Sequence, residues 1–375
     1  MEMLELIRRA FAGRRVFLTG HTGFKGGWLA LWLEQLGAEV HGYALTPDTS
    51  PALFHLAHID RHTASTIGDI RDLEAVARAM TGARPDIVMH LAAQPLVRRS
   101  YREPVETFAS NVMGTVNVLE AVRRTPSVRA ALVVSSDKCY ENPADLHAGS
   151  GFREDDPMGG HDPYSASKGC TELVTAAWRS SFFQSGVPGA HGAAIGSARA
   201  GNVIGGGDWS EDRLVPDLVR AFANGNPARI RQPHAVRPWQ HVLEPLWGYL
   251  LLTAHLLNDD ATSRSGFNFG PQADDAVPVG ELVRQMCDRW GPEARWFDES
   301  EANAPHEAHH LRLDCSKART LLGWRPAIDL KRGIDLTAAW YREVLAGADA
   351  AALCLEQIRT HERAIAALES PLERA

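Results

Sequence analysis

Short apolar runs alternate with stretches of helical periodicity over the first 200 residues. The runs cover residues 16–18, 38–44, 86–93 and 130–136. Helical periodicity is clearest after the first run, at Trp28, Leu29, Leu31, Trp32, Leu33 and Leu36, and it ends at Gly37. Buried strands that alternate with helices are typical of parallel sheets covered on both faces. The pattern therefore predicts an α/β fold with a doubly wound parallel sheet of the Rossmann type.

The regular alternation stops near residue 200, and the chain becomes loop-rich. The loop-rich segments are 201–209, 224–238, 271–279 and 294–326. We expect residues 1–200 to form mainly the sheet domain and residues 201–345 to form mainly a smaller substrate lobe, interleaved with returns to the sheet. Residues 346–375 are rich in Ala, Leu, Glu and Arg, which predicts a helical tail. The amphipathic pattern of residues 1–13 predicts a helix that covers the sheet edge.

Composition narrows the class of protein. The chain has 375 residues and a formal net charge of −7, without a block of Lys or Arg, which argues against a nucleic-acid partner. Its five cysteines are scattered without a Cys-x-x-Cys pair, so neither disulfides nor a metal site is expected. No apolar run is long enough to span a bilayer, and the N-terminus lacks the features of a signal peptide. We expect a cytoplasmic protein without a membrane partner.

Three glycines, Gly20, Gly23 and Gly26, separate the first strand from the first long helix in the spacing G-x-x-G-x-x-G. The first allows a tight turn, the second lets a pyrophosphate approach the backbone, and the third lets helix and strand pack closely. The helix N-terminus then offers free N–H groups to phosphate. The turn predicts a dinucleotide site made by Gly20, Thr22, Gly23, Phe24, Lys25 and Gly26.

The end of the second strand leaves the choice between NAD and NADP open. An acidic residue there commonly binds the adenosine ribose hydroxyls, but this chain has Ala44, Leu45 and Thr46, with Asp48 as a loose candidate. No arginine stands there to bind a 2′-phosphate either. We expect NAD as the cofactor.

Further cofactor contacts are expected where other strands end. Asp69 is placed to accept a hydrogen bond from the adenine amino group, although the alternative is a helix N-cap, a role for which Asp72 competes. Small residues at a strand end suit a ligand that lies across the sheet edge. The remaining candidates are Ile70, Leu91, Ala92, Ala93 and Asn111.

Tyr164 and Lys168 are the strongest catalytic candidates. Four residues apart on a predicted helix, their side chains share one face. A lysine ammonium and a nicotinamide cation both favour the phenolate, which can take a proton from a sugar hydroxyl while hydride leaves the same carbon. The alternative is an incidental pair on a surface helix. After a dinucleotide turn we favour the catalytic interpretation, in which both residues also contact the cofactor.

Ser136-Asp137-Lys138 follows a predicted parallel strand, at the sheet edge where ligands bind in open α/β folds. Ser136 can hydrogen-bond a reacting hydroxyl or carbonyl. Asp137 can act as a general acid if burial raises its pKa. Lys138 can act as a base if desolvation or nearby positive charge keeps part of it neutral. The alternative for Asp137 and Lys138 is a solvated turn.

Five motifs together resemble one superfamily: GHTGFKG, LAAQ, Asn111 where a helix begins, SSDKCYEN and PYSASK. They are similar to the extended short-chain dehydrogenase/reductases and, more narrowly, to the nucleotide-sugar 4,6-dehydratases, over residues 14–334. Most of these dehydratases have Thr-Asp-Glu where this chain has Ser136-Asp137-Lys138. The Asp-Lys pair and GHTGFKG resemble the members that act on CDP-glucose, in deoxysugar biosynthesis such as that of lipopolysaccharide O-antigens.

The resemblance implies a hydro-lyase mechanism. Tyr164, assisted by Lys168 and Ser136, would remove the proton of the sugar 4-hydroxyl while hydride passes from C4 to NAD. Lys138 would take the C5 proton, and Asp137 would protonate the departing 6-hydroxyl. After this loss of water, the return of hydride to C6 would give CDP-4-dehydro-6-deoxy-glucose. In an alternative, Lys138 orients substrate or water and Asp137 performs both proton steps.

Substrate contacts are expected from the second half of the chain. The segment from Arg199 to Asn202 resembles the family segment whose Asn meets the nucleotide diphosphate. Guanidinium groups bind phosphate well, although single arginines are also typical of surface ion pairs. The candidates are Asn202, Arg199, Arg213, Arg231 and Arg237. Glu307, His309 and His310 are weaker candidates for a sugar contact and lack metal-ligand spacing.

Two predicted helices, one after Asn111 and one over residues 164–178, have apolar outer stripes. In the resembling family such helices pair across a twofold axis as a four-helix bundle, which implies a homodimer. Two functional alternatives remain: a dehydratase or 4-epimerase of a UDP-, GDP- or dTDP-linked hexose, and a non-catalytic dinucleotide-sensing protein.

Overall fold

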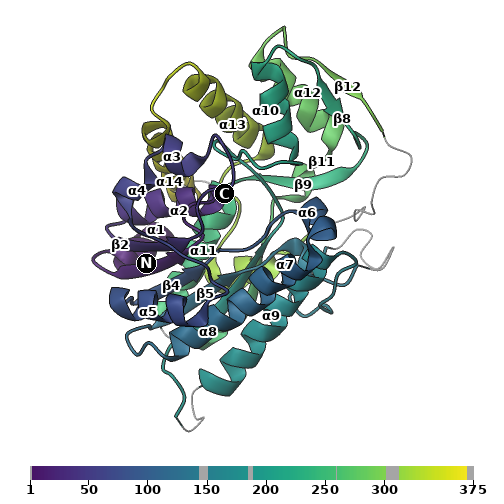
Figure 1. The fold of residues 1–375 in the computed structure, drawn as a ribbon. Coiled ribbons are helices and arrows are strands. Elements are labelled where there is room, and N and C mark those ends of the chain that lie inside the picture. The colour runs from purple at the N-terminus through teal and green to yellow at the C-terminus, as the bar shows by residue number, and fades with distance from the viewer. Residues whose placement is uncertain (1, 143–150, 185–188, 259, 301–311, 370–375) are drawn as a thin grey trace.

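A seven-stranded parallel sheet forms the centre of the protein in a computed structural model, which describes residues 2–142, 151–184, 189–258, 260–300 and 312–369 (Figure 1). The strand order is β10-β6-β5-β4-β1-β2-β3, and each neighbouring pair is parallel. The strands are β1 (Arg15–Thr19), β2 (Glu39–Ala44), β3 (Ala64–Ile67), β4 (Ile87–His90), β5 (Ala130–Val134), β6 (Ala194–Ala200) and β10 (Gly266–Phe269). The predicted doubly wound parallel sheet is confirmed.

Helices cover both faces of this sheet, which explains why its inner strands read as continuous apolar runs. One face carries α5 (Leu73–Ala83), α8 (Gly114–Arg123) and α9 (Pro163–Phe182). The other face carries α1 (Met3–Phe11), α2 (Phe24–Gln35), α11 (Leu243–Leu257) and α14 (Ala350–Glu369). Side chains of β1 alternate between the two, since Val16 and Leu18 pack on the second face and Phe17 on the first.

The N-terminal helix α1 does not cover a sheet edge as predicted. Its main contacts are α11 and α14, in a layer over one face. Short elements complete this half of the chain: α3 (Leu53–Leu56), α4 (Ile59–His62), α6 (Val97–Arg102), α7 (Pro104–Phe108), the π-helical turn η1 (Ala109–Met113) and the 3-10 turn η2 (Asp137–Cys139).

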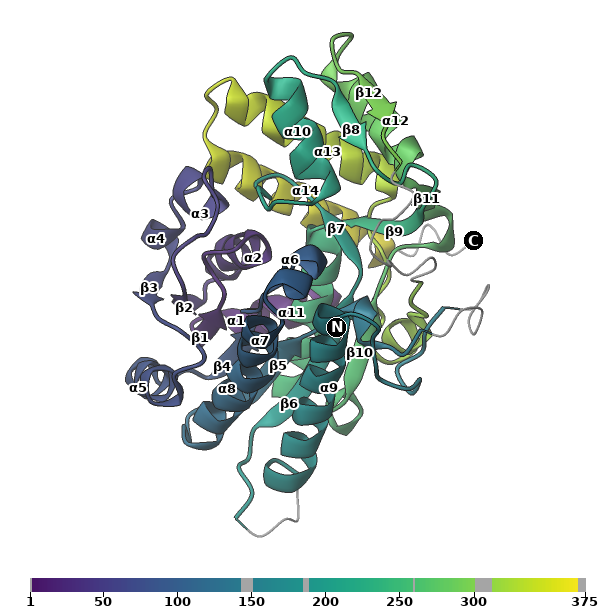
Figure 2. The same ribbon diagram turned by 45° about the vertical axis from the view of Figure 1, so that its right-hand side comes forward.

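The second half of the chain forms a smaller lobe and returns to the main sheet through α11 and β10 (Figure 2). Its strands are β7 (Asn202–Ile204), β9 (Val236–His241) and β11 (Ala276–Pro278) in one sheet, with β8 (Ala228–Ile230) and β12 (Trp296–Asp298) in another. Its helices are α10 (Leu214–Ala223), α12 (Val279–Trp290) and α13 (Leu330–Leu345), with the short turn η4 (Ala273–Asp275). The short turns η3 (Ala261–Ser263) and η5 (Ala318–Leu322) pack against α11, and η5 also contacts β10 of the main sheet.

Candidate active site

A cavity of about 930 Å³ lies where the carboxyl ends of the main strands meet the smaller lobe. It is lined by most of the predicted cofactor residues: Gly20, Thr22, Gly23, Phe24, Lys25, Gly26, Asp69, Ile70, Leu91, Ala92 and Ala93. The predicted catalytic residues Ser136, Asp137, Lys138, Tyr164 and Lys168 also line it. So do Asn202, Arg213, Arg231 and Arg237. Residues separated by more than 200 positions therefore share one cavity.

The glycine turn has the geometry of a phosphate cradle. Gly20 has φ +82°, and a Cβ there would lie 2.8 Å from the backbone nitrogen of Ala92. A Cβ on Gly26 would lie 2.0 Å from the carbonyl oxygen of Gly20. Gly23 caps α2 without a side chain, so the first turn of the helix opens onto the cavity. These residues fit a pyrophosphate at a helix N-terminus.

The structure separates the two roles considered for Asp69. The N-cap of α5 is Asp72, whose side chain accepts a hydrogen bond from Ala75 N at 2.9 Å. Asp69 instead pairs with Arg71, whose Nε donates to Oδ2 at 2.8 Å, and it lines the cavity. Asp48 also lines the cavity and forms an ion pair with Arg99 at 3.3 Å.

Asn111 does not line the cavity. Its Oδ1 accepts from Gln94 N at 2.8 Å, and its Nδ2 donates to Gln94 O and to Ser167 Oγ. Asn111 therefore fixes the loop after β4 and joins it to α9, while Gln94 itself lines the cavity. The predicted cofactor contact of Asn111 is thus indirect in this geometry.

The turn after β5 buries the Asp137 side chain. Ser136 Oγ donates to Asp137 Oδ1 at 3.0 Å, and Asp137 is 2% exposed, while its Oδ2 is buried without a partner among the described residues. Burial raises the pKa of Asp137, and the opposing effects of Lys138, Ser136 and Lys25 are smaller. A raised carboxyl pKa is the direction that general-acid catalysis requires. Lys138 beside it is only partly buried.

Tyr164 and Lys168 face the cavity from the first two turns of α9. The helix begins at Pro163 after Asp162, whose side chain accepts from Ser165 N at 2.9 Å. Burial raises the pKa of Tyr164 to about 12, although a hydrogen bond with Ser136 lowers it. Burial lowers the pKa of Lys168 to about 8. The predicted lowering of the phenol pKa is therefore outweighed by burial, and the phenolate needs added positive charge at the moment of reaction.

Lys25, a predicted cofactor residue, enters the same cavity. Its ammonium lies 5.9 Å from the centre of the buried Tyr249 ring. Burial lowers its pKa to about 7, and the nearby charges of Arg213 and Lys168 act in the same direction. The chain has five lysines, Lys25, Lys138, Lys168, Lys317 and Lys331, and the first three line this cavity. The gathering of three of the five lysines in one cavity can be recognised only when the fold is known.

The smaller lobe contributes arginines to the far side of the cavity. Arg213 forms an ion pair with Asp208 at 3.0 Å, and Arg231 forms one with Asp212 at 3.1 Å. Arg237 is buried, and its Nη1 donates to Val236 O at 3.0 Å. Arg98, from α6, and Trp239, from β9, line the cavity as well, although neither was predicted as a site residue.

Arg199 is not part of this cavity. It is buried on β6, and its Nη2 donates to Glu172 Oε2 at 3.0 Å, while Nη1 donates to Tyr140 OH at 2.6 Å. It lines a second cavity together with Glu172 and Arg179, further along α9, so the predicted substrate contact is not supported by its position. Glu307, His309 and His310 lie outside the described residues.

Neither a metal cluster nor a membrane span occurs in the described part of the chain. Among the described residues, no group of three or more His, Cys, Asp or Glu side chains is arranged to hold a metal ion. None of the helices formed by these residues is long and apolar enough to cross a membrane.

Comparison with known proteins places this geometry in a family. The family model described as GDP-mannose 4,6 dehydratase matches residues 17–337. The curated CDP-glucose 4,6-dehydratase of Salmonella typhimurium (strain LT2) is 49% identical over 337 residues, which cover 90% of this chain and 93% of that protein.

Solved structures agree in fold. The UDP-glucose 4-epimerase of Thermus thermophilus, in complex with NAD, has a TM-score of 0.74 and 25% identity over 88% of this chain and 99% of that one. The dTDP-glucose 4,6-dehydratase of Streptomyces venezuelae, with NAD and TYD bound, has a TM-score of 0.71 and 24% identity over 88% of this chain and 97% of that one. The predicted resemblance is confirmed, and the chain belongs to the GDP-mannose 4,6 dehydratase family of the extended short-chain dehydrogenase/reductases.

Proposed function

We propose that this protein catalyses the 4,6-dehydration of CDP-glucose to CDP-4-dehydro-6-deoxy-glucose and water. The observation that carries the proposal is the meeting, in one cavity, of Tyr164 and Lys168 with the strand end Ser136-Asp137-Lys138. The first pair suits oxidation of a sugar hydroxyl, and the strand end adds an acid and a base for elimination. CDP-glucose is chosen as the substrate because the Salmonella relative, which is 49% identical, is named CDP-glucose 4,6-dehydratase.

The cofactor that fits the glycine turn is NAD. The turn has no room for side chains at Gly20 and Gly26 and opens the N-terminus of α2 onto the cavity, as a pyrophosphate requires. Two solved relatives of the same fold hold NAD. When bound, NAD would supply a hydride acceptor for sugar C4 and later a hydride donor for C6.

In the oxidation step, Tyr164 takes the proton of the sugar 4-hydroxyl. The Lys168 ammonium stabilises the resulting phenolate, and Ser136 hydrogen-bonds the reacting oxygen. Because burial holds the pKa of the free phenol near 12, the step depends on positive charge close to the ring. Lys168 supplies that charge from the same helix face, and its ammonium is held by Val134 O at 3.4 Å.

In the elimination step, the new C4 ketone acidifies the C5 proton. Lys138 in its neutral form takes that proton, the C5–C6 double bond forms, and the C6–O bond breaks as Asp137 protonates the leaving hydroxyl. Water leaves with the proton of Asp137. The raised pKa of the buried Asp137 carboxyl fits an acid that starts protonated. The alternative, in which Asp137 makes both proton transfers, keeps Lys138 as an orienting group.

The diphosphate of the substrate is assigned to the arginines of the smaller lobe. Three arginines line the same cavity as Asn202: Arg213, Arg231 and Arg237. A guanidinium group can bind two phosphate oxygens at once through two parallel hydrogen bonds. Arg237 is the most buried of the three, so its charge is the least screened by water. The sugar then lies between the lobe and the reactive strand end.

The proposed assembly is a homodimer built as a four-helix bundle. Val105 on α7, Met113 on η1 and Leu173 on α9 are 81%, 53% and 58% exposed, and these elements pack against one another. An exposed apolar surface of this kind costs free energy in water unless a partner covers it. A second copy of the chain would present the same surface across a twofold axis.

The test is a panel of CDP-, UDP-, GDP- and dTDP-glucose, incubated with the purified protein and NAD and followed by mass spectrometry. The expected result is loss of one water from CDP-glucose, alkali-dependent absorbance of a 4-keto sugar and no net NADH. If CDP-glucose stays inert while another nucleotide sugar loses water, the substrate assignment is wrong. If a sugar is converted without change of mass, the activity is epimerisation.

A further inference from the structure

Glu172 is a buried carboxylate directly behind the catalytic strand end. It lies on α9 one turn after Lys168, and it is 5% exposed. Its Oε1 accepts from Ser135 Oγ, and its Oε2 accepts from Ser197 Oγ at 2.7 Å and from Arg199 Nη2 at 3.0 Å. Donors from β6 and from Ser135, the residue directly after β5, thus hold one carboxylate of the helix.

These contacts join α9 to β5 at two consecutive residues. Lys168 Nζ donates to Val134 O at 3.4 Å, and Glu172 accepts from the hydroxyl of the next residue, Ser135. Ser136 follows directly. The i,i+4 spacing on α9 places Lys168 and Glu172 on one helix face, so the pair contacts consecutive residues of the strand. A shift of the Glu172 carboxylate would therefore move the strand end against the catalytic helix.

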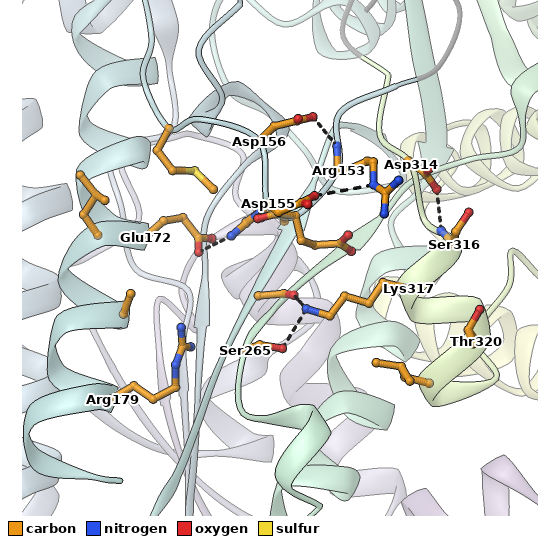
Figure 3. A pocket seen from close by; sticks show the side chains of 17 residues that line it. Arg153, Asp155, Asp156, Glu172, Arg179, Ser265, Asp314, Ser316, Lys317 and Thr320 are labelled. Carbon is orange, nitrogen blue, oxygen red and sulfur yellow. Dashed lines mark hydrogen bonds and ion pairs between the residues drawn. The ribbon is translucent and has the colours of Figure 1, made fainter.

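Figure 3 shows the other side of Glu172, in the second cavity, of about 830 Å³. The figure shows Lys317 directed at Ser265, to whose Oγ its Nζ donates at 2.9 Å. Glu172 Oε2 accepts from Arg199 Nη2, and Lys317 Nζ also donates to Gly266 O. Arg199 is thus the cation that pairs with Glu172, and their side chains are both 5% exposed. Because hydroxyl groups also donate hydrogen bonds to Glu172, the carboxylate is held in one position.

The charge of Glu172 acts on Lys168. The groups that face Lys168 are Glu172 on its own helix, Lys25 of α2, His90 of β4 and Cys139 of η2. Burial lowers the pKa of His90 to about 3 and raises that of Cys139, so both are neutral near pH 7. Although burial raises the pKa of Glu172, Arg199 and the two hydroxyls outweigh it, so the carboxylate is ionised. Glu172 is therefore the anion of this group.

We propose that Glu172 is a positioning residue, which keeps the Lys168 ammonium charged and fixes the strand end that carries Ser136. This inference rests on the proposed function, because it assigns Glu172 a part in the same reaction. It also reassigns Arg199, which acts on the site by holding Glu172 and not by contacting substrate.

The direct test measures the titration of Lys168 in protein labelled with ¹³C at the lysine ε-carbon. The five lysines give five signals, and a Lys168→Arg protein identifies the one of interest. In Glu172→Gln the Lys168 titration midpoint should fall by about one pH unit or more, since an opposite charge at this range shifts a pKa by roughly 1–3 units. The matched control is Glu154→Gln, which lines the same cavity and hydrogen-bonds Asn268 N without touching β5. It should leave the Lys168 midpoint unchanged.

Kinetics then separates positioning from general stability. With Lys168 deprotonating at lower pH, the alkaline limb of the kcat profile should move to lower pH in Glu172→Gln, while KM for CDP-glucose stays within about twofold. The Glu154→Gln profile should match that of the wild type. If Glu172→Gln fails to fold, Glu172→Gln/Arg199→Met removes both charges of the pair, and the same shift of Lys168 is expected.

An unchanged Lys168 midpoint in a folded Glu172 variant overturns the inference, as does a kcat profile whose alkaline limb stays at the wild-type pH. Failure of the wild-type protein to dehydrate any nucleotide sugar would instead overturn the proposed function. In that case the Lys168 titration still decides whether Glu172 controls the lysine.

Discussion

Gly201 leaves the space that the Asp137 carboxyl group occupies: a Cβ at residue 201 would lie 2.7 Å from Asp137 Oδ2. The two residues follow neighbouring parallel strands, β6 and β5. Gly201→Ala should push the carboxyl group off its position and lower kcat by about tenfold or more, since proton transfer depends on hydrogen-bond reach. Steady-state rates with CDP-glucose, with circular dichroism to verify folding, check this expectation.

The control for that substitution is Gly192→Ala. Nothing lies within 4 Å of a Cβ at Gly192. The control should keep wild-type kcat. Equal rates for the two variants would show that the position of Asp137 is not limiting.

The lowered pKa of Lys25 predicts a pH-dependent cost in stability. A drop from 10.5 to about 7 on folding corresponds to roughly 3–6 kcal/mol. The unfolded chain binds the proton more tightly, so the cost is fully present below pH 7 and fades as the pH rises toward 10.5. Lys25→Met should therefore raise the urea midpoint of unfolding more at pH 6 than at pH 9.5.

Lys331 on α13 is exposed and serves as the control. Lys331→Met should change the urea midpoint by the same small amount at both pH values. A gain for Lys25→Met that is equal at pH 6 and pH 9.5 would contradict the assigned burial of its charge.

The proposed function assigns Arg237 to the substrate and Arg199 to the structure around Glu172. Arg237→Met should raise KM for CDP-glucose by roughly 10- to 100-fold, the loss expected for a charged hydrogen bond to phosphate. Arg199→Lys keeps the charge beside Glu172 and should leave KM within about twofold. Initial rates over a range of CDP-glucose at saturating NAD measure both. A large KM change for Arg199→Lys alone would restore Arg199 as a substrate contact.

The dimer proposal predicts a mass in solution of about twice 41.0 kDa. Val105→Glu places a charge in the proposed interface and should shift the mass measured by light scattering toward that of one chain. Leu345→Glu is the control, because Leu345 is also exposed but ends α13 in the smaller lobe. If Val105→Glu keeps the full mass while Leu345→Glu loses it, the interface lies elsewhere.

The apolar runs predicted β1, β2, β4 and β5, but they did not include β6 or β10, whose residues are all buried. Residues 64–67 form β3 with all four side chains exposed, so no apolar run marked it, and it is held by backbone pairing with β2. The segment 224–238 was expected to be loop-rich, but it includes β8 and the start of β9. β9 buries polar residues such as Arg237 and Gln240, which hydrophobic periodicity does not register.

The candidate site residues also fall into two groups: those that local spacing identifies and those whose position depends on the tertiary fold. Gly20, Tyr164 and Lys168 are recognisable because their spacing along a turn or a helix fixes their geometry. Arg199 was assigned to the wrong cavity because the face on which a strand side chain lies depends on the register of the sheet. Lys25 was predicted from the glycine turn as a cofactor residue, but its position beside the Tyr249 ring is set by the tertiary fold, which no local pattern contains.

The central claim is elimination across C5 and C6 by groups on the β5 strand end, and turnover of CDP-glucose in D₂O tests it most directly. Base removal of the C5 proton and its later replacement from solvent predict a product that has lost one water and carries one deuterium at C5, located by mass spectrometry and NMR. A product of unchanged mass, or one that has lost water without deuterium at C5, would contradict the account.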